Sequence, residues 1–313
     1  MSFSSHRYAR LAFSAVVVSV FITARARAQN SEVRSKILVS SDWLASHIND
    51  PNLVLLHVGE KSEYDREHLP GARFIRLDDV ADSDHEKPGA LMLQMPSSEK
   101  LREKLAGLGI SDDSRVVVYY GNDWVTPATR VIFTLDYAGL GNQSSLLDGG
   151  MQQWKREKRA VTAALPPVTK GSLSTLKIHP IIVDAEWVRS NLAKPGISVV
   201  DGRSASFYDG VQTGMGMHGE KHRAGHIAGA KSIPFTEISD DRLLIKSSAQ
   251  LAALFAKAGV KPGDTVVGYC HIGQQATGML FAARSLGYKV LLYDGSFEDW
   301  TTRKDYPVEA VSQ

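Results

Sequence analysis

The chain has 313 residues, of which 43% are hydrophobic and 22% are charged, and it contains a single cysteine. This composition is that of an ordinary globular protein, and it excludes collagen-like, disordered and disulfide-stapled classes. Residues 1–28 hold four arginines and no acidic residue, so the rest of the chain carries a net charge of −2 rather than +2. That balance argues against general binding to nucleic acid or to an anionic membrane.

The first residues have the layout of a secretory signal peptide. Two arginines precede an apolar run at Leu11–Ile22, and a small-x-small cleavage site follows at residues 26–28. The apolar run is shorter than the ~18 residues that a membrane-spanning helix needs. We therefore expect cleavage of residues 1–28 before Gln29 and a periplasmic or secreted protein that is free of the membrane. An uncleaved interfacial anchor and a mitochondrial presequence are the alternatives.

The remainder of the chain is an internal repeat. Five short segments recur in the same order in both halves, a pattern that rarely arises by chance. The paired prolines Pro166 and Pro167 favour an extended connection between the copies. We expect an N-terminal domain at 35–157, a linker at 158–178 and a C-terminal domain at 179–310. The matching segments are 40–44 with 184–188, 68–72 with 226–230, 101–109 with 251–259, 116–119 with 266–269, and 147–150 plus Trp154 with 293–296 plus Trp300.

Each copy has the pattern of a small α/β domain. Short β-branched runs at 53–56 and 116–119 in the first copy, and at 197–200 and 265–269 in the second, predict strands. Apolar residues between Leu251 and Ala258 recur with helical spacing. Strands that alternate with helices predict, in each copy, a small parallel sheet flanked by helices.

The cysteine lies where a ligand-binding loop is expected. Cys270 directly follows the predicted strand at 265–269, and the loop at 271–275 leads into a helical segment. Ligands bind at the carboxyl ends of parallel strands, and a helix N-terminus offers free N–H groups and a positive dipole end. Such surroundings favour the thiolate, whereas a buried, unreactive cysteine is the alternative. Because the first copy has Tyr120 at this position, only the second copy is equipped for cysteine chemistry.

The loop sequence narrows the chemistry open to Cys270. A phosphate-cleaving loop commonly carries an arginine six residues after the cysteine, where this chain has Ala276. A Cys-x-x-Cys exchanger needs a second cysteine, and His271 is too close in sequence to serve readily as the base of a cysteine hydrolase. Sulfur transfer remains, in which a thiolate carries a sulfane sulfur as a persulfide and the loop amides hold its anionic end.

These residues resemble the tandem-domain rhodaneses, a family of thiosulfate and 3-mercaptopyruvate sulfurtransferases. The resemblance implies two rhodanese-like domains, a persulfide on Cys270 and a non-catalytic N-terminal domain. It also implies a small-molecule sulfur donor and a thiol or cyanide acceptor, and we expect no cofactor. The resemblance covers most of residues 35–310, and it rests on 40–44, Asp201-Gly202-Arg203, 225–230, the loop after Tyr269, and 293–296 with Trp300.

The expected substrate-binding residues are those of the loop, together with one arginine. Arg203 is a candidate ligand for an anionic substrate, and a structural pair with Asp201 is the alternative. Asp294 and Trp300 match a packing element and are assigned no catalytic role. The loop residues are His271, Ile272, Gly273, Gln274 and Gln275.

Two departures from the family pattern leave the donor open. Thiosulfate-specific loops often carry Arg-Lys after the cysteine and mercaptopyruvate-specific loops carry Gly-Ser-Gly, whereas this loop begins His271-Ile272-Gly273. Phe207 occupies a position where family members tend to have an arginine. Thiosulfate is the expected donor and 3-mercaptopyruvate the alternative. A non-catalytic sulfur- or anion-binding module and a redox sensor are the remaining alternatives.

The segment at 210–225 offers replacements for the missing cations. Lys221, His222 and Arg223 are the candidates, and a solvated loop is the alternative. His218, His222 and His226 are spaced by four, but the neighbouring glycines disfavour the helix that would bring them together, so we expect no metal site.

Overall fold

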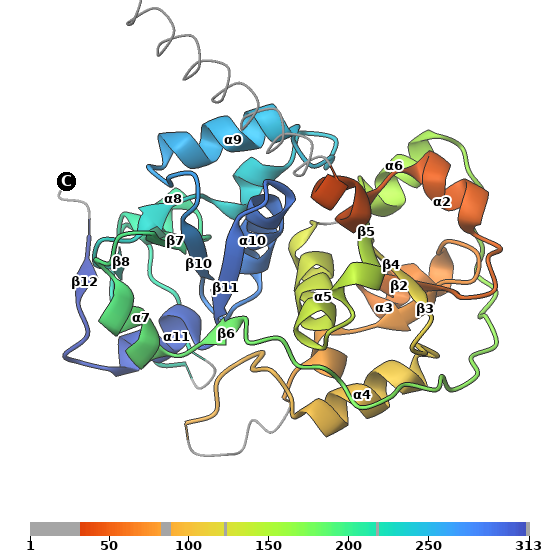
Figure 1. Ribbon diagram of the computed structural model, residues 1–313, viewed down its shortest axis with the longest axis horizontal. Helices are drawn as coiled ribbons and strands as arrows, with labels where there is room; N and C mark the ends of the chain where they lie inside the picture. The colour runs from red at the N-terminus through yellow and green to blue at the C-terminus, as the bar shows by residue number, and fades with distance from the viewer. Residues whose placement is uncertain (1–31, 83–88, 122–123, 217–218, 311–313) are drawn as a thin grey trace, which may run out of the picture.

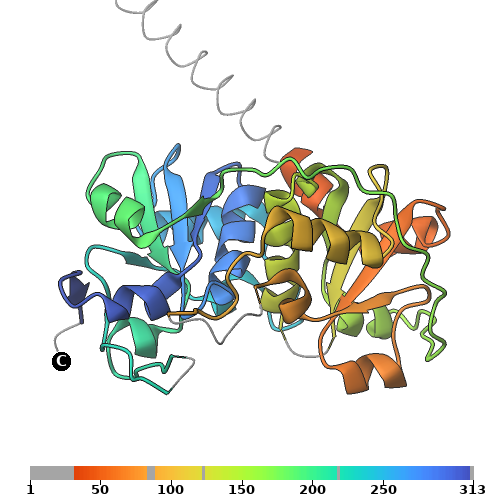
Figure 2. The ribbon, with the colours of Figure 1, turned by 90° about the horizontal axis from the view of Figure 1, so that it is seen from below.

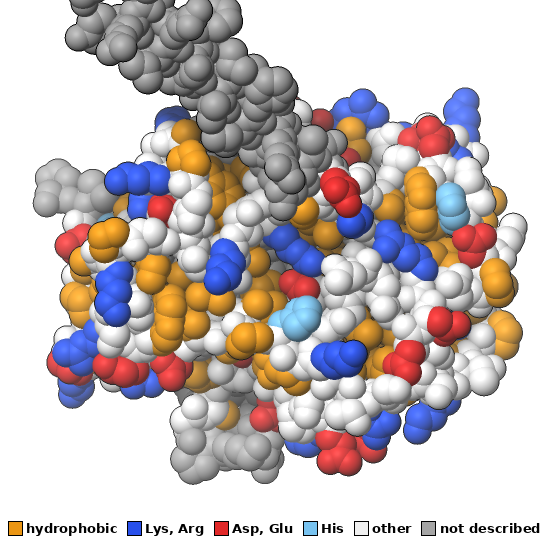
Figure 3. Space-filling model, viewed as in Figure 1, with side chains coloured by type: hydrophobic (Ala, Val, Ile, Leu, Met, Phe, Trp, Pro, Cys, Tyr) orange, Lys and Arg blue, Asp and Glu red, His pale blue; other side chains and the backbone are white. Residues whose placement is uncertain are grey.

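The computed structural model describes residues 32–82, 89–121, 124–216 and 219–310, which form two lobes side by side (Figure 1). The expected signal peptide at 1–28 lies outside these residues. Among the described residues, no helix is both long and apolar enough to cross a membrane. Basic and acidic side chains are interspersed over both lobes on the face that Figure 3 shows.

The N-terminal domain is a parallel five-stranded sheet with the strand order β1-β5-β4-β2-β3. Its helices cover both faces, as the sequence predicts. The strands are β1 (Leu38–Val39), β2 (Leu53–Val58), β3 (Arg73–Ile75), β4 (Arg115–Tyr120) and β5 (Ser144–Leu147). The helices are α2 (Ser41–His47), α3 (Lys61–Arg66), α4 (Ser98–Gly107), α5 (Thr126–Tyr137) and α6 (Gly150–Arg156), with 3₁₀ turns η1 (Leu77–Val80) and η2 (Gly141–Gln143).

The C-terminal domain repeats this topology with the order β6-β11-β10-β7-β9 and adds an antiparallel pair, β12 with β8. The predicted α/β class with two parallel sheets is thereby confirmed. Its strands are β6 (Ile182–Val183), β7 (Ile197–Asp201), β8 (His226–Ile227), β9 (Lys231–Ser232), β10 (Thr265–Tyr269), β11 (Lys289–Tyr293) and β12 (Val308–Glu309). Its helices are α7 (Ala185–Asn191), α8 (Ala205–Tyr208), α9 (Ser248–Lys257), α10 (Gln275–Ser285) and α11 (Ser296–Thr302), with the 3₁₀ turn η3 (Phe235–Ile238).

A long connection without helix joins the domains. It leaves α6 at Arg156, enters β6 at Ile182, and runs along the outside of the molecule (Figure 2). Its only ladder contact with the N-terminal domain among the described residues is an isolated bridge between His68 and Thr162. The linker predicted at 158–178 falls within this connection.

The two domains share one hydrophobic core, and this positions the site. Side chains alternate across each sheet, so Val116 and Val118 of β4 face one core while Val117 and Tyr119 face another. The shared core contains residues of both domains and includes most of α5 and α10, which lie next to each other at the centre of the molecule (Figure 1). An apolar sequence around most of a helix is typical of such a buried position.

Candidate functional site

Cys270 lies at the carboxyl end of β10 and faces the core that the domains share. Val267 and Tyr269 belong to the outer core of the C-terminal domain, whereas Val266 and Cys270 belong to the shared core. The side chain has no exposed surface. The backbone N–H of Cys270 donates to the Ser296 hydroxyl at 3.2 Å, so the start of α11 fixes the residue in place.

The loop after Cys270 presents unused hydrogen-bond donors. Gly273 has φ +80°, a left-handed conformation that glycine adopts without strain, and α10 begins two residues later. No described residue accepts a hydrogen bond from the backbone N–H groups of residues 271–275. The first N–H groups of a helix have no acceptor within the helix, and together with the dipole they favour an anion. These donors are available to an anionic group at the loop, and substrate binding by residues 271–275 stays a prediction.

In the N-terminal domain, the position equivalent to Cys270 is held by Tyr120, which contacts the other domain. The Tyr120 hydroxyl donates to the carbonyl of Leu243 in the other domain at 2.7 Å, and Trp124 packs edge-on against Phe235. Gly150, the counterpart of Ser296, has φ +51°, and a Cβ there would lie 2.8 Å from the Tyr120 carbonyl oxygen. The absence of a side chain at Gly150 thus leaves room for Tyr120, where the C-terminal domain has Cys270.

Arg203 is engaged by protein groups. Its Nε and Nη2 donate to both carboxylate oxygens of Asp201 at 2.6–3.1 Å, and Nη2 also donates to the carbonyl of Gly225 at 2.8 Å. The guanidinium lies 4.2 Å from the centre of the Phe297 ring. Burial lowers the pKa of Arg203 and the Asp201 carboxylate raises it, with a net upward direction. This geometry favours the structural alternative, and substrate contact by Arg203 stays a prediction.

Two histidines lie near each other at the loop, and one of them, His222, is a candidate replacement for the missing cations. The His271 ring packs edge-on against Phe207 at 4.5 Å between centroids, and His222 lies 6.5 Å away. Burial and the Arg203 cation lower the pKa of His271 to about 4, and the same causes lower the pKa of His222. Both rings are therefore neutral at pH 7. Among the described residues, neither ring nitrogen of His222 has a hydrogen-bond partner, although its side chain is buried.

The other candidates of the segment at 210–225 point elsewhere. The Arg223 guanidinium donates to the carbonyls of Trp300, Arg303 and Tyr306, so it fastens the segment to the end of α11. Lys221 is exposed, and its backbone forms an isolated antiparallel bridge with Met215. His226 stacks on Tyr208, and its Nδ1 lies 2.8 Å from the Tyr208 carbonyl oxygen. His218 lies outside the described residues, among which no cluster of three potential metal ligands occurs.

A residue that the sequence reasoning missed reaches the loop from the other domain. Arg130 of α5 is 1% exposed, and its Nη1 donates to the carbonyl of Gly273 at 3.0 Å and to the Asp294 carboxylate at 2.9 Å. Asp294 also accepts from the N–H of Met95 at 2.7 Å. A lone cation within an otherwise apolar helix is a signal for a buried partner, because an unpaired charge is costly to bury.

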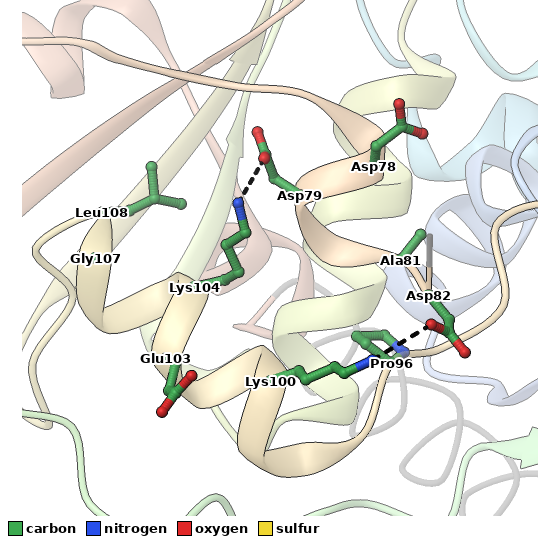
Figure 4. Close-up of a pocket in the computed structure, with 10 residues that line it drawn as sticks. All are labelled: Asp78, Asp79, Ala81, Asp82, Pro96, Lys100, Glu103, Lys104, Gly107 and Leu108. Carbon is green, nitrogen blue, oxygen red and sulfur yellow. Dashed lines mark hydrogen bonds and ion pairs between the residues drawn. The ribbon is translucent and has the colours of Figure 1, made fainter. Parts of the chain in front are cut away.

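Two larger pockets lie in the N-terminal domain, and neither is lined by Cys270. One, of about 520 Å³, lies between η1 and α4, and its lysines are paired with carboxylates: Lys104 with Asp79 at 3.0 Å and Lys100 with Asp82 at 3.8 Å (Figure 4). The other, of about 450 Å³, lies at the carboxyl ends of β2 and β4, and Tyr120 forms part of its wall.

Comparisons with known proteins agree with this architecture. The model of the rhodanese-like domain matches residues 40–157 and again 184–303. The chain is 30% identical to the sulfur carrier protein TtuD of Thermus thermophilus, over 87% of this chain and 96% of that protein. It is 30% identical to a Mycobacterium leprae protein named for thiosulfate sulfurtransferase activity (89% and 99%) and 29% identical to the 3-mercaptopyruvate sulfurtransferase of Escherichia coli K12 (87% and 98%).

Solved structures show the same fold. YnjE superposes with a TM-score of 0.77 at 26% identity, over 88% of this chain and 68% of that chain. A structure of EanB with a cysteine persulfide and ergothioneine superposes with a TM-score of 0.77 at 20% identity, over 89% and 71%, which is a likeness of fold alone. With two matches of one domain model and relatives that align along nearly their whole length, this chain belongs to the rhodanese family, as a protein with two rhodanese-like domains in tandem.

Proposed function

We propose that the protein is a sulfurtransferase that carries a sulfane sulfur as a persulfide on Cys270. The observation that carries this proposal is the loop after β10, which directly follows the chain's single cysteine and in which no described residue accepts from the N–H groups of residues 271–275. A persulfide ends in an anionic sulfur, which such amides stabilise without a general base. The names of the relatives from Mycobacterium leprae and Escherichia coli support the same chemistry.

The reaction balances with thiosulfate as donor. The Cys270 thiolate attacks the outer sulfur and forms the new S–S bond, while the bond to the inner sulfur breaks and its electron pair leaves with sulfite. Cyanide or a thiolate then attacks the terminal sulfur, which departs as thiocyanate or as a new persulfide. The electron pair of the broken bond returns Cys270 to the thiolate, so the cycle consumes no external oxidant or reductant.

The donor test compares thiosulfate with 3-mercaptopyruvate, following sulfite and pyruvate separately. We expect turnover with thiosulfate, a high KM, and loss of transfer in Cys270→Ser, because a hydroxyl cannot form a persulfide. Tyr120→Phe is the matched control, since it alters the equivalent position of the silent domain and keeps the ring. Transfer by the serine variant would remove Cys270 from the mechanism. Absence of turnover with either donor would favour the non-catalytic sulfur-binding or redox-sensing alternative.

We also propose that the protein is exported and processed. The support is the basic–apolar–small order of residues 1–28. Expression of the full chain in a bacterial host, followed by intact-mass measurement of the periplasmic fraction, should give a polypeptide that begins near Gln29. Recovery of a chain that retains Leu11–Ile22, or its confinement to the cytoplasm, would contradict this proposal.

A further inference from the structure

The catalytic loop is held by the domain that has no cysteine. Arg130, on α5 of the N-terminal domain, donates through Nη1 to the carbonyl of Gly273 at 3.0 Å, across 143 positions of sequence. The side-chain amide of Gln274 donates to the Thr126 hydroxyl on the same helix at 3.3 Å. Two consecutive loop residues are thus fastened to α5 from outside their own domain.

Arg130 is itself rigidly placed. It is 1% exposed, its Nη1 also contacts the Asp294 carboxylate at 2.9 Å, and its Nη2 donates to the carbonyl of Leu93. Asp294 stands at the start of the turn into α11, which in turn fixes Cys270 through Ser296. A charge-assisted hydrogen bond at a buried site restricts its partner more strongly than a neutral one does.

The contact with Arg130 fixes the orientation of the peptide group between Gly273 and Gln274. In a trans peptide the C=O and the following N–H point in opposite directions. Because the Gly273 carbonyl is directed toward the Arg130 guanidinium, the N–H of Gln274 is directed away from that guanidinium. Gly273 has φ +80°, a conformation in which the loop can turn its amides.

We propose that Arg130 is a positioning residue for the persulfide: by holding the Gly273 carbonyl it aims the next N–H at the sulfur carried on Cys270. The N-terminal domain thereby contributes to catalysis without contributing a nucleophile. This inference rests on the proposed function for its chemistry, although its geometry stands on the contacts above.

The test separates loop positioning from domain docking. Arg130→Met removes the contact to Gly273 but leaves the Asp294 carboxylate unpaired, so the double variant Arg130→Met/Asp294→Asn removes both charges. Arg130→Lys keeps the charge. The matched control is Arg284→Gln, which breaks another cation contact of the same interface, Arg284 with Asp136 at 3.1 Å between α10 and α5, away from the loop.

Three quantities are measured on each full-length variant: the melting temperature, the single-turnover rate of sulfite release from thiosulfate, and the rate of Cys270 alkylation by iodoacetamide. We expect the Arg130→Met and double variants to lose about tenfold in the sulfite-release rate and to change the alkylation rate, with partial rescue in Arg130→Lys. Arg284→Gln should lower the melting temperature and leave both rates within about twofold of the natural protein.

Equal rates in the double variant and in Arg284→Gln would overturn the proposal and leave Arg130 with a docking role only. The alkylation rate needs no sulfur donor, so it distinguishes the two hypotheses. If the natural protein transfers no sulfur but the Arg130 variants still change alkylation beyond the control, the positioning role stands and the proposed function fails.

Discussion

Phe207 occupies a position where, by resemblance to the family, an arginine would hold an anionic donor. Its ring lies edge-on to His271, whose pKa of about 4 leaves it uncharged at pH 7, and Arg203 is committed to Asp201. Under the proposed function, attraction for thiosulfate is left to the loop amides and the helix end, which contribute only ~0.3–1 kcal/mol in typical surface settings. Weak ground-state binding is the expected consequence.

Replacing Phe207 by arginine should strengthen that binding. A charge-assisted contact contributes about 1.5–3 kcal/mol, which corresponds to a KM for thiosulfate lower by roughly ten- to hundredfold. Steady-state kinetics would measure it, with Phe207→Leu as a control that keeps the site apolar. An unchanged KM in Phe207→Arg, or tight saturation by thiosulfate in the natural protein, would show that another cation already binds the donor.

Elements differ in how far the sequence predicts them. The strand expected at 265–269 is β10 to the residue, because a β-branched run bounded by turn residues depends on local signals alone. The cysteine loop and α10 follow as expected for the same reason. Local sequence signals do not predict the contact of Arg130 with Gly273, because it depends on how the two domains dock and joins residues 143 positions apart. The burial of His222 likewise depends on the path of its loop over α11.

The packing of α5 against α10 depends on a small residue at Gly278. A Cβ there would lie 3.1 Å from the Ile238 Cδ1 and 3.1 Å from the Thr126 Cγ2, and nearby the Thr129 and Thr277 hydroxyls lie 3.0 Å apart. Gly278→Val should therefore separate the helices, at a cost of about 1–3 kcal/mol. The expected results are a lower urea midpoint and slower sulfur transfer.

The control for that variant is Ala253→Val on the exposed side of α9, which carries the helix-propensity cost of valine without the clash. Equal urea midpoints in the two variants would mean that the interface accommodates the extra methyl groups, and that α5 and α10 are packed less tightly than their contacts indicate.

At the scale of the whole molecule, each domain donates a backbone N–H to a carboxylate that follows a strand of the other domain, β11 in one case and β5 in the other. The Asp294 carboxylate accepts from the N–H of Met95 in the N-terminal domain at 2.7 Å, and its counterpart Asp148 accepts from the N–H of Ile245 in the C-terminal domain at 2.8 Å. This reciprocity between repeated segments links the two domains. It also means that a buried group in either domain affects the stability of both.

A buried histidine, His57, and a half-buried one, His271, make the fold sensitive to mild acid. Burial lowers the pKa of both His57 and His271 to about 4, against about 6.5 in an unfolded chain. The His57 side chain is 1% exposed. The imidazoles have the higher pKa in the unfolded chain, so on acidification the unfolded state binds protons before the folded state does. The stability that the neutral imidazoles contribute is therefore complete above about pH 6.5 and is lost as the pH falls toward 4. Each imidazole accounts for up to about 3 kcal/mol over that window.

We therefore expect the urea midpoint to fall steadily between about pH 7 and pH 5, before most carboxylates titrate. In His57→Gln, which cannot take up a proton at that position, the fall should be shallower although the midpoint at neutral pH is lower, since the Tyr119 hydroxyl loses its Nδ1 partner. Both domains should unfold together in this range, because the shared core and Arg130 link them. A midpoint independent of pH above 5 would mean that His57 and His271 are hydrated and charged in the folded protein, contrary to their burial.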